Sequence, residues 1–174
     1  LSFNAVNHEV ITQGQKASLQ QISLFAGSVG FERIVRQFNF NSQSQIKGRT
    51  DFYYEGANHS LVSGDKAQDE SALKQQLTYR RNSDGQFSLR QVTVLAGDYN
   101  QEKTARVYNL KPDSKTIRSV TDFFYAGGKT ADRADEDDAL TSQVTYRWSI
   151  DTAKKNSLSF NAVNHEVITQ GQKA

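Results

Sequence analysis

The densest group of potential ligands in the sequence is the acidic run at Asp132–Asp138, which has five carboxylates in seven residues. Carboxylate oxygens are the ligands that Ca²⁺ prefers in proteins. However, the run lacks the glycine and the terminal glutamate that an EF-hand loop requires. Like charges at this density also repel one another and are usually solvated. We therefore expect a solvated loop here and no metal site.

Few other residues could carry out catalysis. The chain has His8, His59 and His165, and it has no cysteine. Because no His-x-x-x-His pair is present either, the usual ligand set of a zinc site is missing. Neither a Gly-x-Ser-x-Gly nucleophile motif nor a glycine-rich phosphate loop occurs. The sequence therefore predicts a protein that is not an enzyme and that has no cofactor.

Charged side chains recur at alternate positions of several segments. Successive residues of a strand point to opposite faces of a sheet, so we expect these charged residues to share one face. In a closed barrel this face would line the lumen, and its excess of cations would favour anions. In a soluble sheet it would simply be a solvated face. The candidate lining residues are Lys47, Arg49, Asp51, Lys74, Arg80, Arg90, Arg118, Asp122 and Arg147.

The elements that would position these residues are β-strands. Apolar and polar residues alternate with a period of two rather than 3.6, and β-branched and aromatic residues fit strands. Short turn-like stretches alternate along the chain with longer, charged connections. The short ones are 41–45, 82–86, 111–115 and 151–156, and the longer ones are 13–21, 56–71, 97–105 and 127–139.

In an up-and-down meander, alternate connections lie at the same end of the sheet. The sequence therefore predicts one all-β domain over residues 1–174, an antiparallel meander of about eight to nine strands with a short-turn end and a long-loop end. We expect a closed β-barrel or part of one. The second strand is expected between about Ile22 and Phe40, a stretch long enough to hide a short helix or a bulge at its glycines.

Aromatic residues gather at both ends of the expected strands and leave a less aromatic middle. Interfacial girdles of this kind, together with short turns on one side and longer loops on the other, are typical of outer-membrane barrels. The strands also have about the 9–11 residues that a tilted strand needs to cross a bilayer. The candidate girdle residues are Phe52, Tyr53, Tyr54, Tyr79, Phe123, Phe124, Tyr125, Tyr146 and Trp148.

In this layout the chain resembles the hairpins of bacterial outer-membrane β-barrel proteins. The resemblance covers essentially the whole chain, but it is one of pattern, without a subfamily motif. It implies a closed antiparallel barrel in the outer membrane, with the lipid bilayer as partner, serving as a pore, a transporter or a scaffold. It assigns no role to any single residue.

Two repeats suggest an alternative. Residues 1–17 and 158–174 both read LSFNAVNHEVITQGQKA, which defines a unit of 157 residues. Within this unit, residues 46–80 resemble residues 117–147, since TDFYYEG returns as TDFFYAG and ALKQQLTYR as ALTSQVTYR. Repetition at a fixed period is typical of arrays. The alternative is therefore an extracellular or cell-surface β-module, structural or adhesive, that assembles with neighbouring copies of itself by strand exchange.

Composition narrows the partners further. The chain has 21 basic and 19 acidic residues among its 174, and its formal net charge is +2. A nucleic-acid-binding protein usually concentrates basic residues in one stripe, so this even balance predicts no nucleic-acid partner. No small-molecule substrate is suggested by any motif. No run of about 18 apolar residues is present either, so no transmembrane helix is expected.

Overall fold

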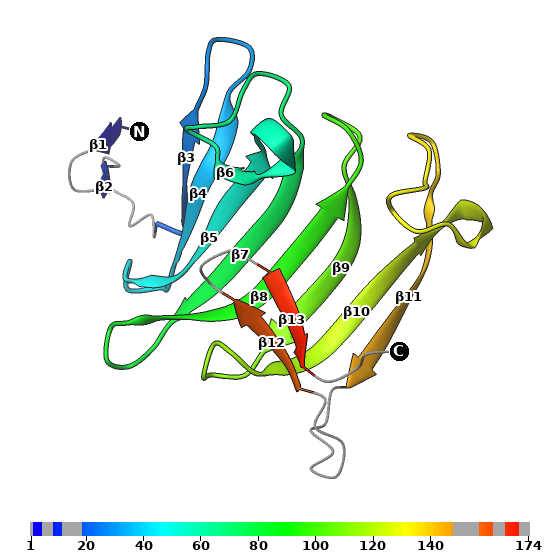
Figure 1. The fold of residues 1–174 in the computed structure, drawn as a ribbon. Coiled ribbons are helices and arrows are strands. Elements are labelled where there is room, and N and C mark those ends of the chain that lie inside the picture. The colour runs from blue at the N-terminus through cyan, green and yellow to red at the C-terminus, as the bar shows by residue number, and fades with distance from the viewer. Residues whose placement is uncertain (1, 5–8, 12–18, 148–156, 162–165, 171–174) are drawn as a thin grey trace.

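The computed structural model describes residues 2–4, 9–11, 19–147, 157–161 and 166–170, and it describes side chains for residues 19–147. Within this part of the chain the regular structure is almost entirely β (Figure 1). Two single-turn 3-10 helices, η1 (Ala57–His59) and η2 (Ala126–Gly128), lie in the connections. The prediction of an all-β chain is therefore confirmed for the described residues.

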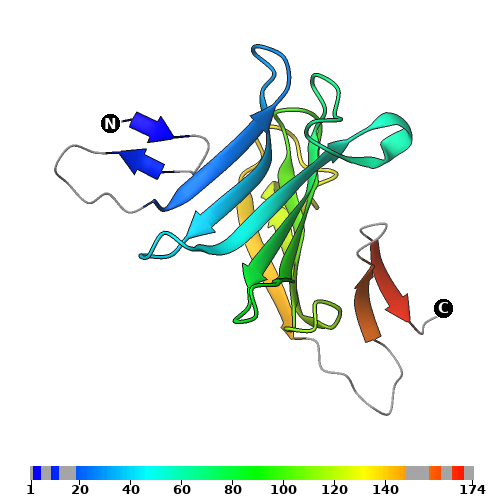
Figure 2. The ribbon, with the colours of Figure 1, turned by 90° about the vertical axis from the view of Figure 1, so that its left-hand side faces the viewer.

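Nine strands form one antiparallel sheet, in the spatial order β11-β10-β9-β8-β7-β5-β4-β3, with β6 paired to β5. Sequence neighbours lie side by side, which is the predicted meander. The sheet is strongly twisted (Figure 2). The strands are β3 (Gln21–Ala26), β4 (Arg33–Phe40), β5 (Ile46–Glu55), β6 (Leu61–Ser63), β7 (Leu73–Arg81), β8 (Phe87–Ala96), β9 (Lys103–Leu110), β10 (Ile117–Tyr125) and β11 (Leu140–Arg147).

The sheet is open. Among the described residues β3 pairs only with β4, and β11 pairs only with β10. The two edge strands do not pair with each other, so the predicted closed barrel is not formed by the described residues. The meander is the part of the fold prediction that the structure supports.

The connections fall into the two expected classes (Figure 1). Residues 41–45, 82–86 and 111–116 form the short-turn end, and residues 27–32, 56–72, 97–102 and 126–139 form the long-loop end. The predicted alternation is confirmed for six of these seven connections, all except 27–32. The prediction of a single strand between Ile22 and Phe40 is wrong, because the chain reverses at residues 27–32, which separate β3 from β4. The predicted connections at 13–21 and 151–156 lie mostly or wholly outside the described residues.

Side chains fix the short turns. The Asn41 Oδ1 atom accepts hydrogen bonds from the backbone N–H groups of Gln43 and Gln45. The Asp113 Oδ1 atom does the same for Lys115 and Thr116, each at 2.9 Å. Asparagine and aspartate favour turns for this reason, since they bond to backbone groups two to four residues ahead.

Glycine is required where two long-end connections begin. Gly27 and Gly97 have φ angles of +124° and +107°, values that side chains with a Cβ rarely adopt. A Cβ on Gly27 would lie 2.4 Å from the Phe31 carbonyl oxygen, and a Cβ on Gly97 would lie 2.5 Å from that of Gln101. The chain can therefore reverse in six residues at both places.

The core lies on one face of the central strands. Leu77, Val92 and Ile117 are essentially inaccessible to solvent. Together with Leu89, Tyr108, Leu110 and Val120 they form one buried cluster, against which Tyr53, Tyr79 and Val94 pack. Burial of this apolar surface is the main force that holds β7 to β10 in one sheet.

The identical terminal segments form the same hairpin. β1 (Ser2–Asn4) pairs with β2 (Glu9–Ile11), and Phe3 lies opposite Val10. β12 (Ser157–Asn161) pairs with β13 (Glu166–Gln170), and Phe160 lies opposite Val167. The corresponding residues of the two copies therefore pair in the same register.

Candidate functional site

Cross-strand pairing divides the side chains of the sheet into two faces. Residues directly opposite each other on neighbouring strands point the same way. One row of partners runs Asp51, Leu77, Val92, Tyr108, Val120 and Tyr146, and we call the side that bears it the apolar face. The adjacent row runs Thr50, Thr78, Gln91, Asn109, Ser119 and Arg147, and we call its side the polar face.

The polar face is held together by hydrogen bonds between side chains. The Gln91 Nε2 atom donates to the Asn109 Oδ1 atom at 3.1 Å, and the Asn109 Nδ2 atom donates to the Ser119 Oγ atom at 3.1 Å. Threonine hydroxyls pair at both sides of this set, Thr50 with Thr78 and Thr121 with Thr145. Polar groups thus cross the sheet from β5 to β11 in an unbroken row.

The nine predicted lining residues do not share one face, so that prediction is wrong. Arg49 lies opposite Tyr79, whereas Arg80 lies opposite Gly48, which places the two arginines on opposite faces. Asp51 and Asp122 are on the apolar face with Arg49. Arg147 lies opposite Ser119 on the polar face.

The other four residues lie at β-bulges. Lys47, Lys74, Arg90 and Arg118 are each the extra residue at a point where the register shifts. A bulge inserts one unpaired residue and redirects the side chains around it, so the period of two fails locally. The sequence gives no clear signal of these shifts, since each bulge lies inside an otherwise regular alternation.

Two ion pairs at corresponding places interrupt the apolar face. The Arg36 Nε atom donates to the Asp51 Oδ1 atom at 2.5 Å, and the Arg106 Nε atom donates to Asp122. Asp51 also pairs with Arg49 at 3.4 Å, and its side chain is only 7% exposed. The Arg49 guanidinium covers the Tyr79 ring at 4.6 Å. A charge this well covered is tolerable because it is paired.

Four arginines gather in a hollow near the short-turn end. The hollow has a volume of about 1020 Å³ and no carboxylate in its lining. Among the described residues, none of these arginines forms an ion pair. The lining residues are Thr78, Tyr79, Arg80, Arg90, Asn109, Leu110, Pro112, Arg118, Ser119, Thr145 and Arg147.

The predicted girdle residues have several environments. Phe52, Tyr54 and Tyr125 are buried, and the Tyr54 and Tyr125 hydroxyls donate to the carbonyl oxygens of Ile34 and Thr104. Tyr146 is 51% exposed on β11. Tyr53, Tyr79, Phe123 and Phe124 are half-buried, and Trp148 lies outside the described residues. Two of the tyrosines thus tie strands together near the long-loop end.

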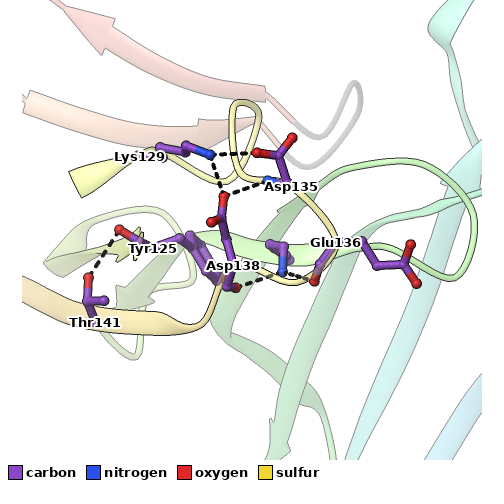
Figure 3. Close-up of polar contacts among 7 residues, drawn as sticks. Tyr125, Lys129, Asp135, Glu136, Asp138 and Thr141 are labelled. Carbon is purple, nitrogen blue, oxygen red and sulfur yellow. Dashed lines mark hydrogen bonds and ion pairs between the residues drawn. The ribbon is translucent and has the colours of Figure 1, made fainter. Parts of the chain in front are cut away.

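Two lysines bond to the acidic run (Figure 3). The Lys129 Nζ atom donates to Asp135 at 2.6 Å and to Asp138 at 2.8 Å. The Lys103 Nζ atom donates to the backbone carbonyl oxygens of Glu136 and Asp138. The bond from Lys129 and one from the Asp135 N–H lower the pKa of Asp138, and the bonds to Asp135 and Asp138 raise the pKa of Lys129.

Within residues 19–147 no group of three or more His, Asp or Glu side chains is arranged to hold an ion. His59 bonds to Glu55 on the surface. His8 and His165 lie outside the described residues.

Comparison with known proteins gave no match: no family model, no curated protein and no solved structure is similar to this chain. In the described residues no helix is long and apolar enough to cross a membrane.

Proposed function

We propose that the chain forms part of the wall of an outer-membrane β-barrel and acts as a passive pore or scaffold. The polar face would be turned to an aqueous interior. The observation that carries the proposal is the unbroken row of polar side chains across the sheet, next to arginines without carboxylate partners. Amide and guanidinium groups are costly against lipid tails. The face that bears them must therefore be in water.

The lengths of four strands fit a bilayer. β5 and β8 have 10 residues each, and β7 and β10 have 9 each. These lengths match a tilted membrane strand. Because Leu77, Val92 and Ile117 are already covered by the chain, lipid would contact the exposed apolar side chains, such as Val144 and Tyr146 on β11. The charges of the apolar face would form neutral Arg–Asp pairs. Closure of the wall then requires further strands between β3 and β11, from the terminal segments or from another chain.

Such a wall acts by electrostatics alone. The arginines of the polar face would attract anions to the aqueous passage and disfavour cations. No bond is made or broken, and the selectivity depends on the number of unpaired arginines facing water.

Sedimentation with and without detergent tests the proposal. We expect the chain to aggregate in plain buffer and to refold in micelles as a β-rich, heat-modifiable band. Reconstituted into planar bilayers, a pore should then conduct anions better than cations. A soluble, monodisperse, β-rich species in plain buffer would contradict the membrane assignment.

A second candidate is supported by different observations. The ion pairs at Asp51 and Asp122 lie on the face that the first candidate turns to lipid. The two terminal segments also form identical hairpins. A soluble extracellular module accounts for the ion pairs and for the hairpins. Its apolar face would be covered by protein, and one hairpin would pair with the open edge of a neighbouring copy. This candidate predicts concentration-dependent oligomers in plain buffer, measurable by analytical ultracentrifugation.

A further inference from the structure

The arginines of the hollow are not explained by the fold. Arg80, Arg90, Arg118 and Arg147 come from four different strands and converge on one hollow without a carboxylate. The Arg90 Nε atom is buried and has no hydrogen-bond partner. The Arg90 Nη2 atom has only the Asn82 Oδ1 atom, at 3.5 Å. A buried donor without an acceptor costs free energy. The Arg90 guanidinium is therefore poorly satisfied within the chain, and it lines a hollow in which an anion would meet three further arginines.

A second hollow at the corresponding place in β3, β4 and β5 serves as an internal comparison. It has a volume of about 470 Å³ and is lined in part by Gln20, Asn39 and Lys47. Lys47 is the bulge residue between β4 and β5, as Arg118 is between β9 and β10. Gln20 corresponds to Arg90, because each stands directly before a glutamine, Gln21 and Gln91. The second hollow therefore has glutamine and lysine where the first has Arg90 and Arg118.

We propose that the arginine-lined hollow is a binding site for an anion that carries two or more phosphate groups. A guanidinium group binds a phosphate through two parallel N–H donors, whereas a lysine acts as a point charge. Four guanidinium groups can thus hold more than one phosphate, and Thr78 and Asn109 add neutral hydrogen-bonding groups. The site adds detail to the proposed function. It rests on that function only for the role of the anion, which would be the solute that passes through the aqueous passage.

Isothermal titration of the folded full chain with inorganic tripolyphosphate tests the site. The variant Arg90→Gln copies the residue of the second hollow, so the fold should tolerate it, and circular dichroism checks this. We expect Arg90→Gln to weaken binding about tenfold, through loss of a charge-assisted bidentate contact. Adding Arg118→Lys should weaken it further. The matched control Arg133→Gln removes one charge in the exposed long loop and should change the dissociation constant less than about twofold.

Two results would overturn the proposal. One is an equal loss in Arg90→Gln and Arg133→Gln, which would mean attraction by overall charge alone. The other is no binding by the folded wild-type chain at millimolar tripolyphosphate. Because the titration needs neither a bilayer nor a conductance, its failure is distinguishable from failure of the proposed pore. Competition with micelles carrying a diphosphorylated lipid tells whether the phosphates come from a soluble anion or from a headgroup.

Discussion

At the scale of single residues, the same contacts occur twice in the sheet. The pairs Arg36–Asp51 and Arg106–Asp122 join neighbouring strands on the apolar face. They differ in solvent exposure: the Asp51 side chain is 7% exposed, and that of Asp122 is 19% exposed. A charge-assisted hydrogen bond is worth more where solvent is excluded. The two pairs should therefore contribute unequally to stability.

Asp51→Asn should destabilise the fold more than Asp122→Asn. The substitution keeps the size of the side chain but leaves Arg36 and Arg49 without their anionic partner. We expect a loss of about 1–3 kcal/mol for Asp51→Asn and a smaller loss for Asp122→Asn. Urea denaturation of both variants measures the difference in unfolding free energy. Equal losses would show that burial of the carboxylate does not set the strength of the pair.

The acidic loop makes a prediction about pH. Its contacts with Lys129 lower the pKa of Asp138, so the folded loop favours the ionised carboxylate. The stability from this group is present above the ordinary aspartate pKa of about 4 and is lost as pH falls through the depressed value. The pKa of Lys129 is raised, so its contribution is present below its ordinary pKa and is lost as pH rises through the raised value.

Hydrogen exchange over residues 126–139 measures this effect. After correction for intrinsic exchange rates, we expect less protection near pH 3 than near pH 6. Lys129→Gln should remove the difference, since it removes the partner of both Asp135 and Asp138. Protection in the wild-type chain that does not change with pH would show that the lysine does not order the loop.

At the scale of elements, sequence patterns predict the strands better than the faces. Turn residues and the period of two predict the short turns at 41–45, 82–86 and 111–115, because side-chain bonds to the nearby backbone determine them. The reversal at 27–32 was missed, since six residues with two glycines can equally form a bulge. The bulges at Lys47, Lys74, Arg90 and Arg118 depend on how neighbouring strands align. The sequence of one strand does not specify that alignment, so the prediction that the nine charged residues share one face was wrong.

Gly27→Ala should destabilise the β3–β4 connection. The new Cβ would meet the Phe31 carbonyl oxygen, and the φ angle of +124° is unfavourable for alanine. We expect a cost of at least about 1–3 kcal/mol, measured by thermal unfolding. Gly30→Ala is the control, because its φ angle is also positive but no heavy atom lies within 4 Å of the new Cβ. If both variants lose the same amount, the close backbone approach is unimportant.

At the scale of the whole molecule, the open sheet leaves β3 and β11 as edge strands among the described residues. All eight residues of β11 are exposed, including Leu140, Val144 and Tyr146. An exposed strand edge with apolar side chains is a template for further strands. The arginine hollow could not be predicted as a unit either, because its four arginines come from four strands and two of them, Arg90 and Arg118, lie at bulges.

Val144→Lys should reduce association through this edge. A lysine on an edge strand is a common natural device against pairing with other chains. We expect sedimentation velocity to show less oligomer at a given concentration, or a smaller share of closed, heat-modifiable band in micelles. Thr130→Lys adds the same charge in a loop and should have no such effect. Unchanged association of Val144→Lys would mean that β11 is not the edge used.

The short turns and the long loops lie at opposite ends of the sheet, so the two ends of the molecule differ. Lys66 and Arg133 belong to connections at the long-loop end, whereas the described short turns contain lysine only at 111–116, as Lys111 and Lys115. Trypsin added to one side of a sealed vesicle would therefore leave a different fragment pattern according to which end it meets. If the chain inserts as proposed, its orientation could be determined from those fragments alone, without a label or an antibody.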